Sequence, residues 1–423
     1  MRRLYAAVAL GIGILLILGA AVFVETRSSA SSSPKVEILH CKGVSLMPML
    51  LVTEQIDGFI AWQPYPALAE ESGIGRQICL SGDLPPAGRW EDHPCCVLVA
   101  RSDHIKDHPD FVRAFCALNI YATEYIERNK TEVSEIAAEW LMGKENFTLG
   151  KTSVPSSQVL KKAGSTLKFV HEPSSVWMDQ ARVITLRQGK TLNVEGSLGS
   201  EGQANSSKTI FDFQSHQETL DALGIGQVPL ASMVPMIPMV PRAFVTRPLE
   251  EPICIGYISS DLHHLPLFVA VKKWRYFNDT YGIALRPMDE GQSRPNRLEL
   301  MVSGRRIGEI DLVPANAGPT MMTLMEQNCV QLAYVGIAPA VGAIGLGADV
   351  RVIQPLQDGG SGLVVSESSP ARNWTSFVSW AEERSKEGRH LRIADPEKGT
   401  IQDIMIKDAL KEAGISTIAS WDS

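Results

Sequence analysis

The chain has 423 residues, of which 44% are hydrophobic and 21% are charged. This composition suits a globular protein large enough to form two or three lobes. The formal net charge of −7 argues against broad nucleic-acid binding, so we expect no nucleic-acid partner.

The N-terminus differs in character from the rest of the chain. Arg2 and Arg3 precede an uncharged apolar run from Leu4 to Val24, and a Ser-rich stretch follows at 28–33. The run is long enough to span a bilayer, and the basic residues before it place the N-terminus inside. We therefore predict that 1–33 is a membrane anchor with a tether and that the remainder is extracytoplasmic. The alternative is a cleaved signal peptide. Five Asn-x-Ser/Thr sequons weakly support an exported surface: Asn129, Asn146, Asn205, Asn278 and Asn373.

The first half of the remaining chain predicts strands, helices and one long amphipathic helix. Pro64 and Pro66 are expected to prevent regular structure, which places Trp62, Gln63 and Tyr65 at the carboxyl end of a strand. The predicted strands are Val36–Leu39, Asp57–Trp62 and Cys95–Ala100, and the predicted helices are Val44–Thr53, Pro109–Asn129 and Glu132–Leu141, with mixed helices and loops over 150–225.

Residues 227–252 interrupt this pattern with six prolines. Such a density excludes the interior of a helix and the centre of a sheet. We interpret 227–252 as an extended linker between two parts of the chain, 34–226 and 253–423.

After the linker, short β-branched strands alternate with helices, which is typical of a parallel α/β sheet. Ligands bind such sheets at the carboxyl ends of strands. Two of these ends, Gly336–Pro339 and Gln357–Gly362, carry small residues that let a ligand approach the backbone, and neither carries a nucleophile–base pair. We therefore expect a small-molecule cradle with no catalytic residue and no cofactor. The predicted strands are Ile253–Ile258, Leu332–Val335, Val350–Ile353, Leu363–Val365 and Leu391–Ala394, the helices are Leu267–Tyr276, Ile337–Ile344, Trp374–Lys386 and Ile401–Ala413, and a polar turn and a Gly-rich loop occupy Ser259–His264 and Asp358–Gly362.

The seven cysteines include no Cys-x-x-Cys pair, which excludes a zinc ribbon. The adjacent Cys95 and Cys96 are interpreted as strand core. Two states of these cysteines are compatible with the sequence: one of them forms a disulfide with Cys79, or both are buried free thiols. The adjacent His263 and His264 are expected to point in different directions, and no spaced acidic or cysteine partner is visible in the sequence, so we predict no metal site.

Several motifs of the second half resemble exported substrate-binding proteins of ABC importers, in their first lobe and the entry into the second: ICIGYISSDLHHLPLFVA, AYVGIAPAVGAIGLGADVRVI, GGSGLVV and ADPEKGTIQDIMIKDAL. The resemblance is to the nitrate/sulfonate/taurine and pyrimidine-precursor (NMT1/THI5-like) family. In the first half, IDGFIAWQPYPALAEESGIGRQI and HPDFVRAFCALNIYATEYI resemble the second lobe of that family and its return to the first lobe.

The resemblance implies an α/β, two-lobed periplasmic-binding-protein-like (type II) fold, with parallel-sheet lobes joined by a hinge. Because the half that resembles the second lobe comes first, the order implies a circular permutation, with 227–252 joining the former ends. A rearranged fragment is the competing account. Permutation is tolerated when the former termini lie close together.

By this resemblance the chain is a solute-binding protein, not an enzyme, that closes on a small anionic or heteroaromatic ligand and delivers it to an ABC permease. The alternatives are an enzyme related to the pyrimidine-precursor synthases and a sensory or non-transporting binding domain. The implied ligand-binding residues are Trp62, Gln63, Tyr65, Ser260, Asp261, His263, His264, Gly336, Ile337, Ala338, Gln357, Ser361, Gly362, Gly399, Thr400 and Gln402.

Three of these residues have a specific expected role. Thr400, at a helix N-terminus, suits a small anion, and the alternative is plain helix capping. Trp62 and Tyr65 could stack on a planar or apolar ligand part, and for Trp62 the alternative is packing in the core or hinge. Asp395, at a turn, is expected to be structural.

Overall fold

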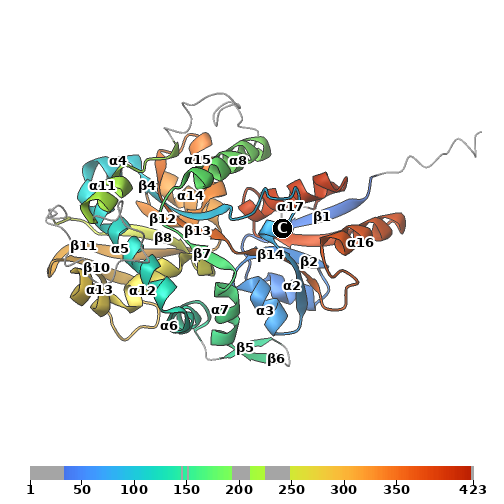
Figure 1. Cartoon of the computed structure of the whole chain (residues 1–423), viewed down its shortest axis with the longest axis horizontal. Helices are drawn as coiled ribbons and strands as arrows, with labels where there is room; N and C mark the ends of the chain where they lie inside the picture. The colour runs from blue at the N-terminus through green and yellow to red at the C-terminus, as the bar shows by residue number, and fades with distance from the viewer. Residues whose placement is uncertain (1–32, 144–145, 150–151, 193–209, 224–247, 421–423) are drawn as a thin grey trace, which may run out of the picture.

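The computed structural model describes residues 33–143, 146–149, 152–192, 210–223 and 248–420. These residues form a six-stranded sheet and an eight-stranded sheet, each flanked by helices in a lobe of its own (Figure 1). We call the two parts the small lobe and the large lobe. The predicted α/β class and two-lobed arrangement are confirmed.

The small lobe combines both ends of the described chain. In the strand order β16-β1-β15-β2-β14-β3, the first four strands are parallel and β14 is antiparallel to both of its neighbours. Strand β1 lies between two C-terminal strands, with Val36 opposite both Leu391 and Thr417. The elements are β1 (Lys35–His40), α2 (Met47–Val52), β2 (Gly58–Trp62), α3 (Tyr65–Glu71), β3 (Gly75–Leu80), β14 (Ser361–Ser366), α16 (Trp374–Lys386), β15 (Leu391–Asp395), α17 (Ile401–Glu412) and β16 (Ser416–Ser420).

The large lobe has the strand order β7-β13-β4-β12-β8-β11-β10-β9. The three strands β12, β8 and β11 are parallel, while β4 is antiparallel to both β12 and β13. The strands are β4 (Pro94–Arg101), β7 (Leu167–Phe169), β8 (Ile253–Ile258), β9 (Ile283–Pro287), β10 (Arg297–Val302), β11 (Arg305–Ala315), β12 (Leu332–Gly336) and β13 (Val350–Gly359).

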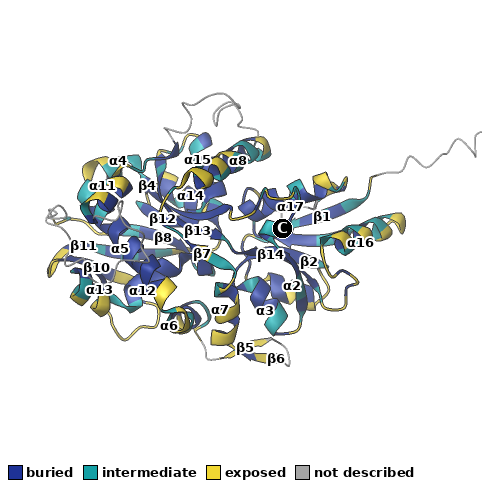
Figure 2. Cartoon of the chain, in the orientation of Figure 1, coloured by how far each residue is buried: buried dark blue, intermediate teal, exposed yellow. Residues whose placement is uncertain are grey.

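Helices cover the sheet of the large lobe and bury its apolar residues (Figure 2). Helix α5 is buried along most of its length because it packs against both α11 and α12. Its Asn119 accepts a hydrogen bond from the hydroxyl of Tyr334 on β12, at 2.5 Å. The other elements are α4 (Ser102–Asp107), α5 (Pro109–Arg128), α6 (Lys130–Ala137), the hairpin β5 (Asn146–Leu149) and β6 (Thr152–Pro155), α7 (Ser156–Gly164), α8 (Ser175–Leu192), α11 (Gln214–Leu223), η6 (Leu262–His264), α12 (Leu265–Lys272), α13 (Trp274–Tyr281), α14 (Gly318–Glu326) and α15 (Ile337–Gly345).

Within the described residues the chain passes from one lobe to the other twice. The first crossing runs from the end of β3 to the start of β4, over 81–93. The second is far shorter, because β13 ends at Gly359 and β14 begins at Ser361. Gly359 and Gly360 have φ angles of 72° and 76°, a left-handed conformation that glycine adopts without steric cost.

The prediction of purely parallel sheets is wrong. Strand β4, from the first half of the chain, lies between β12 and β13 and is antiparallel to both. The prediction of a Gly-rich loop at Asp358–Gly362 is also wrong. Strand β13 includes Asp358 and Gly359, strand β14 begins at Ser361, and only Gly360 lies between them.

Two helix predictions need correction. The helix expected over Leu267–Tyr276 is divided at Lys273 into α12 and α13. Pro64 and Pro66 do not exclude a helix, since Pro66 lies in the first turn of α3, where the missing N–H has no intrahelical partner to lose.

The remaining predictions concern the cysteines and the N-terminus. All seven cysteines are free, so the disulfide considered for Cys79 is not formed. No helix of the described residues is long and apolar enough to cross a membrane. The predicted anchor at 1–33 lies outside the described residues but for residue 33, and so do 227–247 of the predicted linker. In the described part of the predicted linker, 248–252, Leu249 donates its N–H to the carbonyl oxygen of Ile307 on β11 at 2.7 Å.

Candidate functional site

A small cavity lies between the two lobes, with a volume of about 20 Å³. Both lobes contribute to its wall, so any relative movement of the lobes changes its size. The lining residues are Trp62, Thr400, Ile401 and Gln402 from the small lobe, and Cys95, Cys96, Ile258, Asp261, Gly318, Gly336 and Pro339 from the large lobe.

Three helices begin at this cavity. The N-cap residues are Ala317 for α14, Gly336 for α15 and Thr400 for α17. Each helix follows a strand of a parallel pair, so its first turn lies at the carboxyl edge of a sheet. The free N–H groups of a helix N-terminus and its dipole favour negative charge. Three such ends at one cavity favour a small anion.

The helix starts come close together because the residues there are small. A Cβ added at Gly318 would lie 2.4 Å from Cγ of Pro339, in the first turn of α15. A side chain at position 318 would therefore push α14 away from α15 and change the wall of the cavity.

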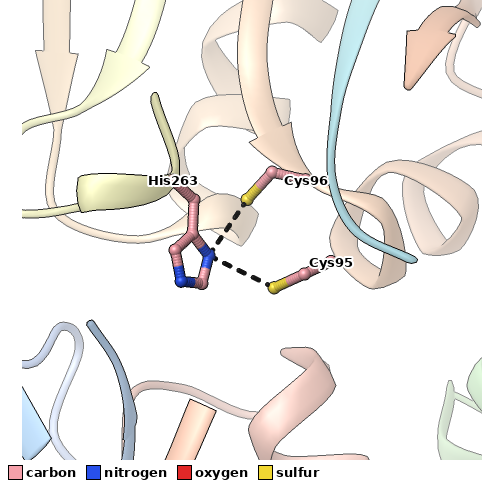
Figure 3. A group of neighbouring side chains, drawn as sticks. All are labelled: Cys95, Cys96 and His263. Atoms are coloured by element: carbon pink, nitrogen blue, oxygen red, sulfur yellow. Dashed lines mark hydrogen bonds between the residues drawn. The ribbon is translucent and has the colours of Figure 1, made fainter. Parts of the chain in front are cut away.

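Two cysteines that line the cavity lie close to a histidine that does not, His263 (Figure 3). In η6, Nδ1 of His263 lies 3.3 Å from Sγ of Cys95 and 3.7 Å from Sγ of Cys96. On the other side of the ring, Nε2 lies 3.1 Å from the carbonyl oxygen of Gly360, which can only accept. Nε2 therefore carries a hydrogen, and Nδ1 either accepts from a thiol or, when protonated, donates to a thiolate.

The two sulfur atoms reach the same imidazole although neighbouring residues of a regular strand face opposite sides. The pairing of β4 with β13 shifts register between Pro355 and Gln357 and again between Gln357 and Asp358, opposite the start of β4. The irregular start of β4 therefore departs from the regular alternation of a strand.

Electrostatics favour a charged pair at this point. Burial would lower the pKa of His263, but the charges of Asp261 and Cys95 raise it to about 9. Burial raises the pKa of Asp261 to about 7, although His263 opposes the shift. A hydrogen bond from Cys96 and the charge of His263 lower the pKa of Cys95, whereas burial raises that of Cys96. A Cys95 thiolate beside a His263 imidazolium is the state of an activated cysteine.

The same residues have the donor set of a soft-metal site. The ligand atoms of Cys95, Cys96 and His263 all lie within 4.8 Å of one another, and so do those of Cys96, Asp261 and His264. Thiolate and imidazole ligands suit zinc, copper or iron. Burial lowers the pKa of His264 to about 3, and its Nδ1 accepts the N–H of Ile258 at 3.0 Å, so this ring is neutral.

The structure divides the sixteen predicted ligand-binding residues into two groups. The members that line the cavity are Trp62, Asp261, Gly336, Thr400 and Gln402. The remaining eleven do not line it: Gln63, Tyr65, Ser260, His263, His264, Ile337, Ala338, Gln357, Ser361, Gly362 and Gly399.

Several of the predicted residues are occupied by contacts within the protein. Thr400 accepts the N–H of Asp403 at 3.4 Å as the cap of α17, the alternative considered for it. Trp62 donates to the carbonyl oxygen of Ser260 at 3.3 Å. Gln402 donates to Oγ of Ser361 at 2.9 Å.

Two more predicted residues hold the lobes or neighbouring turns together. Gln63 donates to Oγ1 of Thr166 at 3.1 Å, and its amide oxygen accepts the N–H of Ala67. The Tyr65 hydroxyl lies 3.2 Å from Oγ of Ser45, and Tyr65 is not among the residues that line the cavity.

Cys95 and Cys96 are absent from the predicted ligand-binding residues. They are buried, as expected for strand core, but they also line the cavity. The sequence showed no cysteine or acidic partner for His263, whereas in the structure its Nδ1 lies 3.3 Å from Sγ of Cys95 and 3.5 Å from Oδ1 of Asp261. The available signal was the Cys-Cys pair at the start of an apolar strand, and the missing information was its contact with residues more than 160 positions away.

Comparison with known proteins places the chain in a family. Residues 31–142 match the model of the NMT1-like family. A relative from Methanocaldococcus jannaschii, Uncharacterized protein MJ1180, is 31% identical over 103 residues, which cover 24% of this chain and 68% of the relative. No solved structure matches the chain. The chain belongs to the NMT1-like family through this N-terminal segment.

Proposed function

We propose that the chain is the extracytoplasmic solute-binding protein of an ABC importer and binds a small anion in the cavity between its lobes. In this proposal 1–33 anchors it to the cell membrane, and the lobes have the arrangement of a permuted type II periplasmic binding protein. The main observation that supports this proposal is that the N-termini of three helices, from both lobes, lie at one cavity. Family membership supports a substrate-binding role in the nitrate/sulfonate/taurine class.

The size of the cavity bears on the ligand. A volume of about 20 Å³ is close to the space that one water molecule needs. The smallest anions of the class, nitrate and bicarbonate, therefore require the least opening of the lobes. Taurine, longer alkanesulfonates and hydroxymethylpyrimidine require a wider separation.

Thermal unfolding of the chain with each of these compounds tests the proposal. A ligand present at 100 times its dissociation constant adds about 2.7 kcal/mol to the free energy of unfolding. We expect one small anion to raise the melting temperature of the wild type and the variant Gln402→Ala to lose most of that rise. Gln327→Ala, at the far end of α14, is the matched control and should keep it. A cooperative transition that no anion moves would contradict the proposal.

A second candidate function is an enzyme with a cysteine nucleophile, and the contact of Cys95 with His263 favours it. Such an enzyme needs a thiolate at neutral pH. The exposed Cys329 provides an internal reference in the same molecule.

Methylthiolation with methyl methanethiosulfonate, read for each cysteine by mass spectrometry, separates the two candidates. For the enzyme, Cys95 should keep its reactivity as the pH falls from 8 to 6, and His263→Asn should reduce it at pH 6 by about tenfold. If Cys95 follows the pH dependence of Cys329 with and without His263, the activated-thiol candidate is wrong.

A further inference from the structure

A second buried cluster lies in the small lobe, apart from the residues that line the cavity. His40 ends β1, Asp395 ends β15 and Asp403 lies in the first turn of α17. Their ligand atoms all lie within 4.8 Å of one another, and all three residues are buried. Nδ1 of His40 is 2.6 Å from Oδ1 of Asp395. Three elements thus direct one imidazole and two carboxylates to one point.

The hydrogen bonds of this cluster leave one oxygen without a donor. Oδ2 of Asp403 accepts the N–H of Gly399 at 2.9 Å, and its Oδ1 pairs with the ammonium group of Lys407. Oδ2 of Asp395 is buried, and no donor of the described residues reaches it. A buried carboxylate oxygen without a donor is costly and indicates a missing positive partner.

The two carboxylates also affect each other. Their ligand oxygens lie within 4.8 Å of each other, and both residues are fully buried. Two buried carboxylates in contact are stable only with a shared proton or a cation between them. Glu397, half-buried nearby, adds a further buried oxygen without a donor among the described residues, Oε2.

We propose that His40, Asp395 and Asp403 bind a divalent transition-metal ion such as Mn²⁺ or Zn²⁺. One imidazole and two carboxylates are a mixed donor set that suits these ions. Ligand atoms at about 2.1 Å from an ion lie roughly 3 Å apart, so only small side-chain movements are needed. Lys407 is partly exposed and can turn to solvent when the ion replaces its charge.

Such an ion would connect the two ends of the described chain. His40 lies 355 positions from Asp395, and the strands that carry them pair side by side. The bound ion would therefore stabilise the sheet at the place where the N-terminal strand β1 enters between C-terminal strands.

The test uses the full chain, freed of metal with a chelator and titrated with MnCl₂ and, separately, ZnCl₂. Calorimetry gives stoichiometry and affinity for both ions, and the electron paramagnetic resonance of free Mn²⁺ gives an independent count. We expect one high-affinity ion per chain. His40→Gln and Asp395→Asn should each weaken binding at least tenfold, whereas Lys407→Ala should strengthen it, because it removes the competing charge.

Two control variants exclude other sites on the protein. The double variant Cys95→Ala/Cys96→Ala removes the thiols of the cavity. His104→Gln/His108→Gln removes a second histidine pair, whose ring centroids lie 4.8 Å apart. Both should keep Mn²⁺ binding. The proposal is overturned if the wild type binds neither ion, or if binding survives in His40→Gln and Asp395→Asn. If those two variants fail to fold by circular dichroism, unchanged affinity in Lys407→Ala overturns it.

Discussion

Asp358, near the end of β13, illustrates what a single buried acid does to stability. Burial raises its pKa to about 8, although Lys168 opposes the shift. In the unfolded chain an aspartate titrates near pH 4, so between about pH 4 and 8 the folded state holds a proton that the unfolded state has released. The free energy of unfolding is therefore unaffected by Asp358 below about pH 4. It falls as the pH rises from about 4 to 8, because only the unfolded chain releases the proton easily.

Asp358→Asn should remove this loss. We expect a gain of about 5 kcal/mol in the free energy of unfolding at pH 8.5, since a pKa difference of about four corresponds to this free energy, and almost none at pH 4, measured by urea titration. Asp349→Asn is the control, because Asp349 is exposed and its ion pair with Arg351, at 3.5 Å, contributes little. An equal gain at both pH values would show that the carboxyl group of Asp358 is not the cause.

The candidate site shows why single residues are hard to assign from sequence. Thr400, Trp62 and Gln402 could be predicted at the cavity because each lies at a strand end or helix start, and such positions follow from the order of elements. The proximity of Cys95 to His263 could not be predicted. It depends on η6 and β4 being brought together and on an irregular pairing of β4 with β13.

At the scale of elements, the connection between β13 and β14 allows two neighbouring glycines, Gly359 and Gly360, to be compared. Gly359 and Gly360 both have positive φ, so alanine at either position costs about 1 to 2 kcal/mol of backbone strain. Only Gly360 is also tightly packed, since a Cβ there would lie 2.0 Å from Leu167 and 2.7 Å from Nε2 of His263. Gly360→Ala should therefore destabilise clearly more than Gly359→Ala.

The measurement is chemical unfolding of the two variants side by side. Gly359→Ala serves as the control for strain alone, because its Cβ would have no neighbour nearer than 3.8 Å. Equal losses of stability in both variants would mean that the contacts of Gly360 add nothing. A larger loss of stability for Gly360→Ala would show that Gly360 is packed tightly against Leu167 and His263.

Individual elements could be predicted well where a local pattern is sufficient. The helix Trp374–Lys386 has the bounds that its amphipathic pattern predicts, with Asn373 as its cap. Strand direction could not be predicted, because the insertion of β4 between β12 and β13 pairs residues more than 200 positions apart. The division of the expected helix at Lys273 was missed because apolar residues continue at helical spacing across it.

At the scale of the whole molecule, polar contacts join the two lobes. Asp408 on α17, in the small lobe, lies 2.5 Å from Arg89 in the first crossing and 2.9 Å from Arg187 on α8. Helix α8 packs on α15 of the large lobe. Next to Arg187, Gln188 donates to the carbonyl oxygen of Gly399 at 2.8 Å. Asp408 is largely buried, so its charge is weakly screened and its loss leaves two arginines without their partner.

Asp408→Asn should therefore shift the protein towards an open arrangement of the lobes. A loss of about 1.4 kcal/mol in the closed state changes the ratio of closed to open molecules tenfold. Small-angle X-ray scattering should show a larger radius of gyration than for the wild type, and amide exchange at the start of α17 should become faster. Asp179→Asn is the matched control, because it removes an exposed ion pair of the same helix α8, between Asp179 and Arg182. If both variants scatter as the wild type does, the arginine contacts of Asp408 do not hold the lobes together, and closure depends on the apolar and backbone contacts around the cavity.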